Sequence, residues 1–297
     1  MTKRSKTQPP WNSTFMGVYG GASTYYGVEL PSERLFVESG YAAALNLHPT
    51  LCPSGPYCWK HDSIIQGLAN LGLQSTLLYS KFSCQLFSSN VLTQIQEAAS
   101  SSLVYVMAME FQLVDEISED GFTFTLPWGP EVPVCLKTAT FEDLLNNRIE
   151  NVFGWVQIEK ITPKSTEECI RTGLANALDM YQNPKHYPYN GYTFGLAAYD
   201  VWTEALTEGE YDRHGHWWNA MVWSECRSQF ANYFKQFAPI ECTETDQLID
   251  LLERSASHLA TTANKDLTDA VKLQNVREAQ QLEQSIPELV QKVFNRL

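Results

Sequence analysis

Long apolar runs are missing from this chain of 297 residues, and so are clusters of Lys and Arg after residue 6. No stretch approaches the roughly 18 apolar residues that a membrane-spanning helix needs. The basic amino terminus is followed by Thr7-Gln8-Pro9-Pro10, where a signal peptide would have an apolar core. The formal net charge is −13, and such a field repels phosphates. We therefore expect no nucleic-acid partner and no membrane partner, and a soluble cytoplasmic protein.

Several catalytic signatures are missing as well. The sequence contains no G-x-S-x-G elbow, no phosphate-binding Gly-rich loop and no H-E-x-x-H motif, which argues against common hydrolases, kinases and metalloproteases. We expect no cofactor. The seven Cys are odd in number and widely spread, which favours reduced thiols over a disulfide framework.

Reactive residues are densest between Asn46 and Asp62, a segment with two Cys, two His and three Pro. Each Pro fixes its own φ and keeps the preceding residue out of the helical region, so residues 47–59 are predicted to form a rigid, extended loop. A nucleophilic thiol needs a base nearby. Cys52 or Cys58 with His48 or His61 could meet that need. The alternative, that such Cys are ordinary buried residues of a structural loop, also remains open.

Zinc binding is the other chemistry that this segment suggests, because it contains four residues of types that zinc takes: His48, Cys52, Cys58 and His61. Their gaps of three, five and two residues match no zinc-finger spacing, and no Cys-x-x-Cys pair is present. We therefore expect no metal site. Further along, His214-Gly215-His216 precedes a predicted helix, and a surface loop is favoured there over a metal site.

The first predicted helix runs from about Thr14 to Tyr26, with Ser13 as its cap and Gly27 at its end. Three glycines lie on one side of this helix: Gly17, Gly20 and Gly21. Glycine destabilises a helix by about 1 kcal/mol relative to Ala, so three of them indicate close approach by a ligand or by another backbone. Both interpretations remain open.

A continuous apolar run over residues 103–109 predicts a buried central strand, and Glu110 follows it directly. An acid at the end of a central strand is a candidate catalytic residue, although a structural carboxylate is an equal alternative. Glu119-Asp120-Gly121 then predicts a hairpin.

Helical patterns dominate the chain after Pro163, where three capping-box pairs open helices: Ser165 with Glu168, Thr243 with Asp246, and Ser285 with Glu288. The predicted fold class is therefore α+β. We expect a disordered lead-in over residues 1–10, an α+β domain over 11–162 and an all-helical domain over 163–297.

Five features together resemble the butirosin biosynthesis protein H-like group, within the papain-like clan that includes double-glycine-leader peptidases. They are the Gly- and aromatic-containing first helix, Gly27-Val28-Glu29-Leu30-Pro31-Ser32, Cys52-Pro53-Ser54-Gly55-Pro56, Glu110-Phe111-Gln112-Leu113-Val114, and Phe194-Gly195-Leu196-Ala197-Ala198-Tyr199-Asp200-Val201-Trp202. The resemblance covers about residues 12–237. It implies a papain-like first domain followed by a helical region.

Active members of that clan carry a catalytic Cys at the start of the first helix and a partner His that opens a central strand or hairpin. Here the first helix begins with Ser13 and Thr14 and contains no Cys. The His position is taken by Glu110 or its neighbours, since residues 104–116 contain no His. The resemblance therefore implies the fold without the usual dyad.

Three functional hypotheses follow. The favoured one is a papain-like-fold protein with a degenerate dyad that binds a small molecule, a peptide or an acyl-carrier-type partner in a cleft between domains. Its candidate ligand-binding residues are Ser13, Thr14, Gly17, Ser54, Gly55 and Trp59. The second is an acyltransferase or amide hydrolase, with Cys52 as nucleophile, His48 as base and Glu110 as a further catalytic residue. The third is a structural interaction protein.

Overall fold

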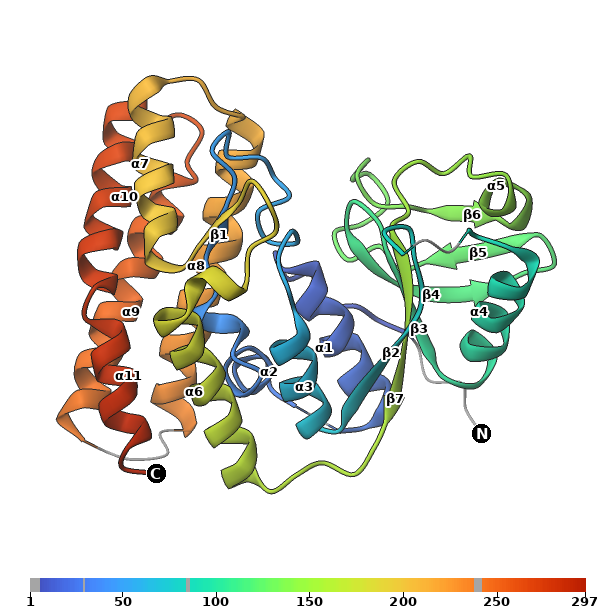
Figure 1. Ribbon diagram of the computed structural model, residues 1–297, viewed down its shortest axis with the longest axis horizontal. Coiled ribbons are helices and arrows are strands. Elements are labelled where there is room, and N and C mark those ends of the chain that lie inside the picture. Colours follow the sequence, from blue (N-terminus) through green and yellow to red (C-terminus); the bar gives the residue numbers. More distant parts are fainter. Residues whose placement is uncertain (1–5, 29, 84–85, 238–241) are drawn as a thin grey trace. The chain divides into compact units, whose positions relative to one another are not determined.

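The computed structural model describes residues 6–28, 30–83, 86–237 and 242–297, and the chain divides into two compact units. Unit 1 comprises the described residues of Met1–Leu30 and Leu68–Pro163, and unit 2 those of Pro31–Gly67 and Lys164–Leu297. Figure 1 shows a sheet in the first and mainly helices in the second. The predicted α+β class is confirmed.

The division differs from the predicted single boundary at residue 162 because Pro31–Gly67 belongs to the helical unit. Helix α2 (Ser32–Glu38) packs against α6 (Thr166–Gln182) and α8 (Arg213–Phe237), which holds this early segment in unit 2. The order of elements along the sequence does not indicate that Pro31–Gly67 packs with helices that follow residue 163.

Unit 1 is built on a six-stranded sheet in which every neighbouring pair is antiparallel. The strands lie in the order β2 (Leu73–Ser80), β7 (Gly154–Lys160), β3 (Leu103–Met107), β4 (Phe111–Ile117), β5 (Gly121–Phe124) and β6 (Thr138–Thr140). Its helices are α1 (Thr14–Tyr26), α4 (Ser89–Ser101) and α5 (Phe141–Leu145), and α3 (Asp62–Asn70) crosses the division between the units. The predicted hairpin is β4–β5.

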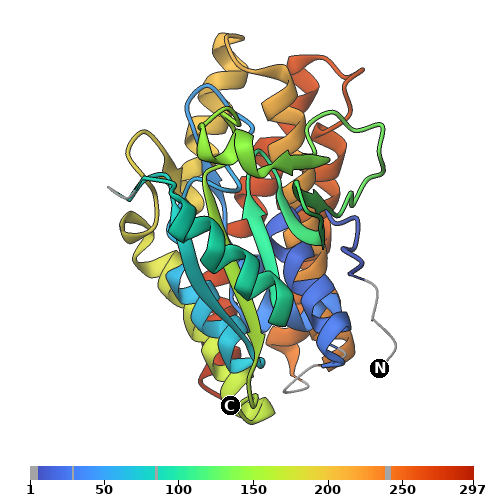
Figure 2. The same cartoon turned by 90° about the vertical axis from the view of Figure 1, so that its right-hand side faces the viewer.

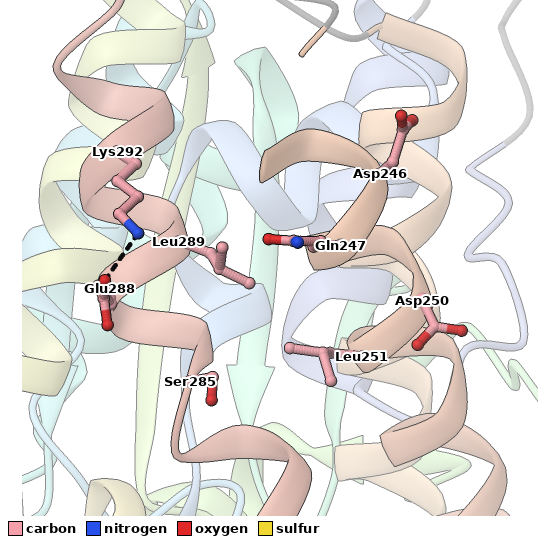
Figure 3. A pocket seen from close by; sticks show the side chains of 8 residues that line it. All are labelled: Asp246, Gln247, Asp250, Leu251, Ser285, Glu288, Leu289 and Lys292. Carbon is pink, nitrogen blue, oxygen red and sulfur yellow. Dashed lines mark ion pairs between the residues drawn. The ribbon is translucent and has the colours of Figure 1, made fainter. Parts of the chain in front are cut away.

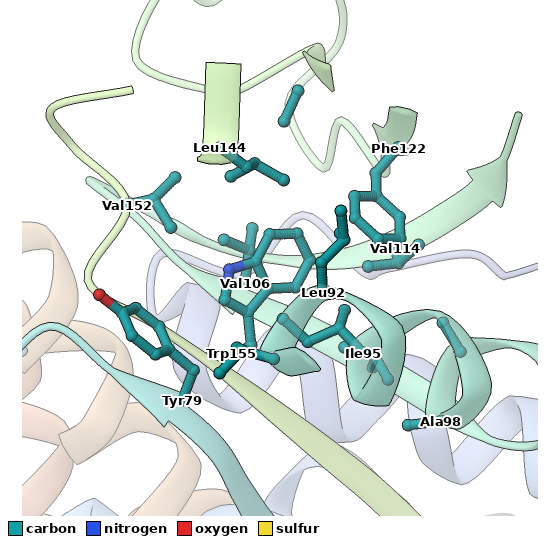
Figure 4. Close-up of a cluster of buried hydrophobic side chains, with 14 of the residues drawn as sticks. Tyr79, Leu92, Ile95, Ala98, Val106, Val114, Phe122, Leu144, Val152 and Trp155 are labelled. Atoms are coloured by element: carbon teal, nitrogen blue, oxygen red, sulfur yellow. The ribbon is translucent and has the colours of Figure 1, made fainter. Parts of the chain in front are cut away.

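Strand β3 is buried on both faces, as its continuous apolar run predicted. Val104 and Val106 belong to a core that includes the apolar side of α4 (Figure 4), and α4 lies across the sheet in Figure 2. The alternate residue, Tyr105, contacts Tyr19 of α1 with ring centroids 6.1 Å apart. Successive side chains of a strand point to opposite faces, so β3 joins a helix on each side of the sheet.

Unit 2 is a helical assembly with one short strand pair. It contains α2, α6, α7 (Ala198–Glu208), α8, α9 (Thr243–Thr262), α10 (Asp269–Glu283) and α11 (Ile286–Phe294), with β1 (Asn46–Leu47) antiparallel to β8 (Thr193–Phe194). A fully buried ion pair lies at its centre: Arg227 Nε is 2.7 Å from Glu283 Oε1, and the guanidinium also donates to the carbonyls of Ala42 and Ala44. The pair therefore ties α8 to α10 and to the turn Tyr41–Ala43.

The predictions of helix ends are confirmed in part. Helix α1 has the predicted bounds, and Gly27 ends it with φ of 63°. The capping box of Ser165 with Glu168 is present. The other two boxes are wrong: α9 and α11 begin without a side-chain cap hydrogen bond.

The predicted extended conformation of the loop is also wrong. Before it, residues 41–47 form a 3-10 turn and a two-residue strand. Residues 52–58 are curled rather than extended, because Gly55 N donates to Cys52 O and Cys58 N to Ser54 O. The Pro residues start turns here and do not extend the chain.

The predicted disordered lead-in does not hold for its described part, since the side chain of Gln8 is buried and hydrogen-bonded in unit 1. Residues 1–5 of that prediction lie outside the described residues. None of the described helices is long and apolar enough to cross a membrane.

Candidate functional site

The predicted site residues fall into two groups, one in each unit. Ser13, Thr14, Gly17 and Glu110 belong to unit 1, and His48, Cys52, Ser54, Gly55 and Trp59 belong to unit 2.

In unit 1, the start of α1 meets the residue that precedes β4. Thr14 Oγ1 donates a 2.6 Å hydrogen bond to Glu110 Oε2 and accepts one of 3.1 Å from the backbone N–H of Phe111. Ser13 is the N-cap, and its hydroxyl accepts from Met16 N at 3.3 Å. Ser13 and Thr14 are fully buried and Glu110 is 5% exposed. A hydroxyl and a carboxylate thus meet where α1 approaches the sheet.

Gln8 covers this part of α1. Its Nε2 donates to Phe111 O at 2.9 Å, and its Oε1 accepts from the Thr125 hydroxyl at 2.7 Å. A Cβ added at Gly17 would lie 3.2 Å from Gln8 Nε2 and 3.3 Å from Pro9 O. The close approach that Gly17 predicted is therefore made by the chain itself, which corrects the expectation of a ligand at this glycine.

Cys135 is a buried thiol near enough to Glu110 to feel its charge. Burial, and to a smaller extent the charge of Glu110, raises the pKa of the Cys135 thiol to about 11. Because only the thiolate is a good nucleophile, this Cys does not replace the one that α1 lacks.

In unit 2, a chain of hydrogen bonds connects the predicted reactive loop to Tyr192. Cys52 Sγ lies 2.9 Å from Ser54 Oγ, and Ser54 Oγ lies 2.7 Å from the Tyr192 hydroxyl. Burial, and to a smaller extent the nearby side chain of Cys58, raises the pKa of Tyr192. Both thiols are partly exposed. We call Cys52, Ser54, Cys58 and Tyr192 the thiol–hydroxyl cluster.

Two buried Asn side chains fix the backbone of this loop. Asn46 Nδ2 donates to Gly55 O at 2.7 Å and to Cys58 O at 3.2 Å. Asn219 Nδ2, from α8, donates to Cys52 O at 3.0 Å. A Cβ added at Gly55 would lie 2.2 Å from Asn219 Oδ1, so Gly55 is needed for close packing. It is buried and lines no surface, unlike the ligand contact predicted for it.

The imidazoles of this segment make other contacts. His48 Nδ1 lies 2.9 Å from Thr50 Oγ1, and its ring is 5.2 Å from that of Tyr192. No hydrogen bond joins His48 to Cys52, although both lie within the described residues. The His61 ring lies against that of Trp59, with centroids 4.1 Å apart and the planes tilted by 33°. The structure therefore brings Cys52 to a hydroxyl and not to the predicted base.

Trp59, a predicted ligand contact, lies in the core of unit 2. Its side chain is fully buried, and its Nε1 donates to Pro56 O at 2.9 Å. Its ring lies 5.1 Å from that of Phe194 in β8. These contacts give Trp59 a structural role in the loop.

Sequence reasoning missed the contributions of Tyr192 and Asn219. Tyr192 is not among the predicted site residues, yet Asn190-Gly191 before it is a turn signal that places it on a loop. Asn219 sits within a helical pattern and carries no local signal. Its role depends on the packing of α8 against residues 51–55.

His216 is buried, which corrects the predicted surface loop. Trp202 Nε1 donates to His216 Nδ1 at 3.0 Å, and His216 Nε2 lies 3.0 Å from Thr262 O. Nδ1 is therefore the acceptor and Nε2 carries the proton. Burial lowers the pKa of His216 to about 4, so the ring is neutral at pH 7. It serves as a structural link between α7, α8 and α9.

A surface groove of about 560 Å³ lies between α9 and α11 (Figure 3). Its lining residues are Asp246, Gln247, Asp250, Leu251, Ser285, Glu288, Leu289 and Lys292. Lys292 Nζ is 2.7 Å from Glu288 Oε1, which leaves Asp246 and Asp250 as the other charges of the groove. The groove contains none of the predicted site residues. Within the described residues, no three side chains of His, Cys, Asp or Glu are grouped so that they could hold a metal ion.

No family model matches the chain, and no curated protein matches it significantly.

Proposed function

We propose that this protein has a papain-like unit of the butirosin biosynthesis protein H-like type with a degenerate dyad, and that it binds a small molecule, a peptide or an acylated partner. The observation that supports the proposal is the 2.6 Å hydrogen bond between Thr14 and Glu110. The resemblance puts the thiol and the imidazole of active members at the start of the first helix and at the opening of a central strand. Thr14 and Glu110 occupy those two places.

The acid–base properties of Thr14 and Glu110 argue against substrate cleavage by this pair. A thiol next to an imidazole is activated because the thiolate–imidazolium pair is accessible near neutral pH. An aliphatic hydroxyl is far less acidic than a thiol, and a carboxylate is a weaker base than an imidazole. The Thr14 hydroxyl also donates a hydrogen bond to Glu110 and accepts one from Phe111 N, so both its donor and its acceptor capacity serve the structure.

A second candidate is acyl transfer or amide hydrolysis at Cys52. The observation in its favour is that this thiol is partly exposed and bonded to Ser54. It ranks lower because the thiol has no imidazole partner and because burial raises the pKa of Tyr192, which makes its phenolate harder to form.

The two candidates are separated by turnover assays of wild type, T14A and C52A with peptide p-nitroanilides and an acyl thioester. We expect no rate above that of the buffer in any of the three proteins. A rate that disappears in T14A contradicts the proposal, and one that disappears only in C52A establishes the second candidate. Native mass spectrometry of wild type then tests binding directly. We expect a bound mass that is lost on denaturation.

The dyad positions can be tested separately by restoring the missing groups. In T14C, the introduced thiol faces the Glu110 carboxylate, which should raise its pKa above the ordinary value of about 8.5. In T14C/E110H it faces an imidazole, which should lower the pKa below that value. The pH dependence of thiolate absorbance measures the pKa of the introduced thiol in both variants, and it needs no reagent that would have to reach the buried position 14. Equal midpoints in the two variants would show that positions 14 and 110 do not form a dyad-like pair.

A further inference from the structure

The thiol–hydroxyl cluster differs from the other described cysteines in exposure and in partners. Cys52, Cys58 and Cys242 are the partly exposed thiols of the described residues. Cys242 lies 3.3 Å from the Thr245 hydroxyl, its neighbour at the start of α9. Cys52 instead contacts Ser54, whose hydroxyl contacts that of Tyr192, and Cys58 follows in the same loop through the Cys58 N–Ser54 O hydrogen bond and lies near Tyr192. Two partly exposed thiols thus lie in one curled loop beside one pair of hydroxyls.

The remaining described cysteines are poor candidates for chemistry. Burial raises the pKa of Cys135 to about 11, and it also raises the pKa of Cys169 and Cys226. All three are buried and remain protonated at neutral pH, so oxidants that react with thiolates reach them slowly.

The backbone between the two thiols is short, curled and held at both ends. The 52–55 turn and the 54–58 turn follow each other, through hydrogen bonds of 3.2 Å and 2.9 Å. Asn219 holds the carbonyl of Cys52, and Asn46 holds that of Cys58. Because the loop is already closed by these contacts, little further chain entropy has to be lost to join the two side chains.

We propose that Cys52 and Cys58 are an oxidation site at which a hydroperoxide converts the two thiols into an intramolecular disulfide. The thiolate of Cys52 attacks one peroxide oxygen, the O–O bond breaks, and a sulfenic acid forms while water or an alcohol leaves. The thiolate of Cys58 then attacks the sulfenic sulfur, the S–S bond forms and a second water leaves. Two thiols are oxidised and one hydroperoxide is reduced by two electrons.

The hydroxyls of Ser54 and Tyr192 assist this sequence as hydrogen-bond donors. A donor that points at a sulfur favours its charged form, which is the reactive one. Tyr192 lies near Cys58 and is connected to Cys52 through Ser54. The inference is independent of the proposed function, since it requires neither a bound ligand nor the Thr14–Glu110 pair.

The experiment treats the reduced protein with hydrogen peroxide, denatures it in N-ethylmaleimide and digests it with trypsin. Cleavage after Arg34 and Lys60 yields one peptide, residues 35–60, that contains Cys52 and Cys58 and no other Cys. We expect this peptide to lose two hydrogens and to carry no maleimide, with recovery of both labels after reduction. A peptide that carries two maleimides while other thiols of the protein have been oxidised overturns the proposal, and so does sulfinic acid at Cys52.

Three variants test the assigned roles. In C58S the reaction should stop at a sulfenic acid of Cys52 that dimedone traps, whereas C242S should form the disulfide at the wild-type rate. In Y192F disulfide formation should be slower by about fivefold, the rate effect of one lost hydrogen bond. Absence of a dimedone adduct in C58S overturns the order of attack, and an unchanged rate in Y192F overturns the role of Tyr192.

Discussion

Thr14 and Glu110 are 96 positions apart in the sequence, yet the hydroxyl of the first is 2.6 Å from a carboxylate oxygen of the second. Phe111 N adds a second hydrogen bond to the same hydroxyl. The contact fastens the first turn of α1 to the beginning of β4, and it makes both side chains part of the framework of unit 1.

Replacing Thr14 by Val should therefore destabilise the protein. The change keeps the shape but removes this hydroxyl from Glu110 and Phe111 N, and a buried polar group that loses a partner costs about 1–3 kcal/mol. Denaturant unfolding of T14V and T14S measures the effect. T14S retains the hydroxyl and should lose less stability than T14V. Equal losses would assign the effect to the methyl group.

Removal of Arg227 should be among the most damaging substitutions in unit 2. R227M leaves the Glu283 carboxylate buried without its cation, and it removes the donors to Ala42 O and Ala44 O. Breaking a buried pair in this way costs about 3–5 kcal/mol. In R227M/E283M the uncompensated charge is gone, so the double variant should lose less than the sum of the two single variants. Additive losses in urea unfolding would contradict a coupled pair.

His216 should make stability fall as the pH is lowered. Its pKa is about 4 in the folded protein, where burial disfavours the charged ring, and about 6.5 when unfolded. The folded pKa is the lower one, so the unfolded state binds more protons between these values. The contribution is complete above pH 6.5 and is lost as the pH falls toward 4.

The expected size of this effect is about 3 kcal/mol between pH 6.5 and pH 4, from a shift of about 2.5 pKa units at 1.36 kcal/mol each. The variant H216Q removes the titrating group, so its unfolding free energy should fall less over the same range. The comparison of wild type with H216Q cancels the other groups that titrate there. Parallel pH profiles of the two proteins would show that His216 does not titrate as described.

Gly215 should not tolerate a side chain. A Cβ at this position of α8 would lie 2.0 Å from Leu51 O and 2.7 Å from Pro53 N, both of which are backbone atoms. Forcing them apart in G215A should cost about 1–3 kcal/mol, although Ala is otherwise the better helix former. The neighbouring H214A is the control because His214 is exposed, and it should change stability by less than about 0.5 kcal/mol. Thermal unfolding of both variants distinguishes local clash from a general effect on α8.

Much of the secondary structure follows from the sequence because its causes are local. Ser13 and Gly27 define α1 through a side-chain cap and a left-handed φ, and the apolar run 103–107 defines a strand covered on both faces. Asp120-Gly121 identifies the β4–β5 hairpin. Each of these signals acts over a few residues, so a pattern in the chain is enough to predict it.

The tertiary structure determines which side chains meet when they are far apart in the sequence. The sequence selected Cys52, Thr14 and Glu110 as chemically interesting, but it paired Cys52 with His48 because they are near in the chain. The fold gives Cys52 a hydroxyl network that includes Tyr192, 138 positions from Ser54, and it gives Thr14 the Glu110 carboxylate.

The assignment of Pro31–Gly67 to unit 2 has the same origin. This segment precedes most of unit 1 in the chain, and its own pattern contains nothing that specifies a partner. Burial of α2 against α6 and α8, together with the hydrogen bonds of Asn219 and Arg227 to its backbone, holds it there. The sequence alone thus determines the helices, strands and turns whose signals are local. The contacts that define the two candidate sites exist only once distant segments pack together.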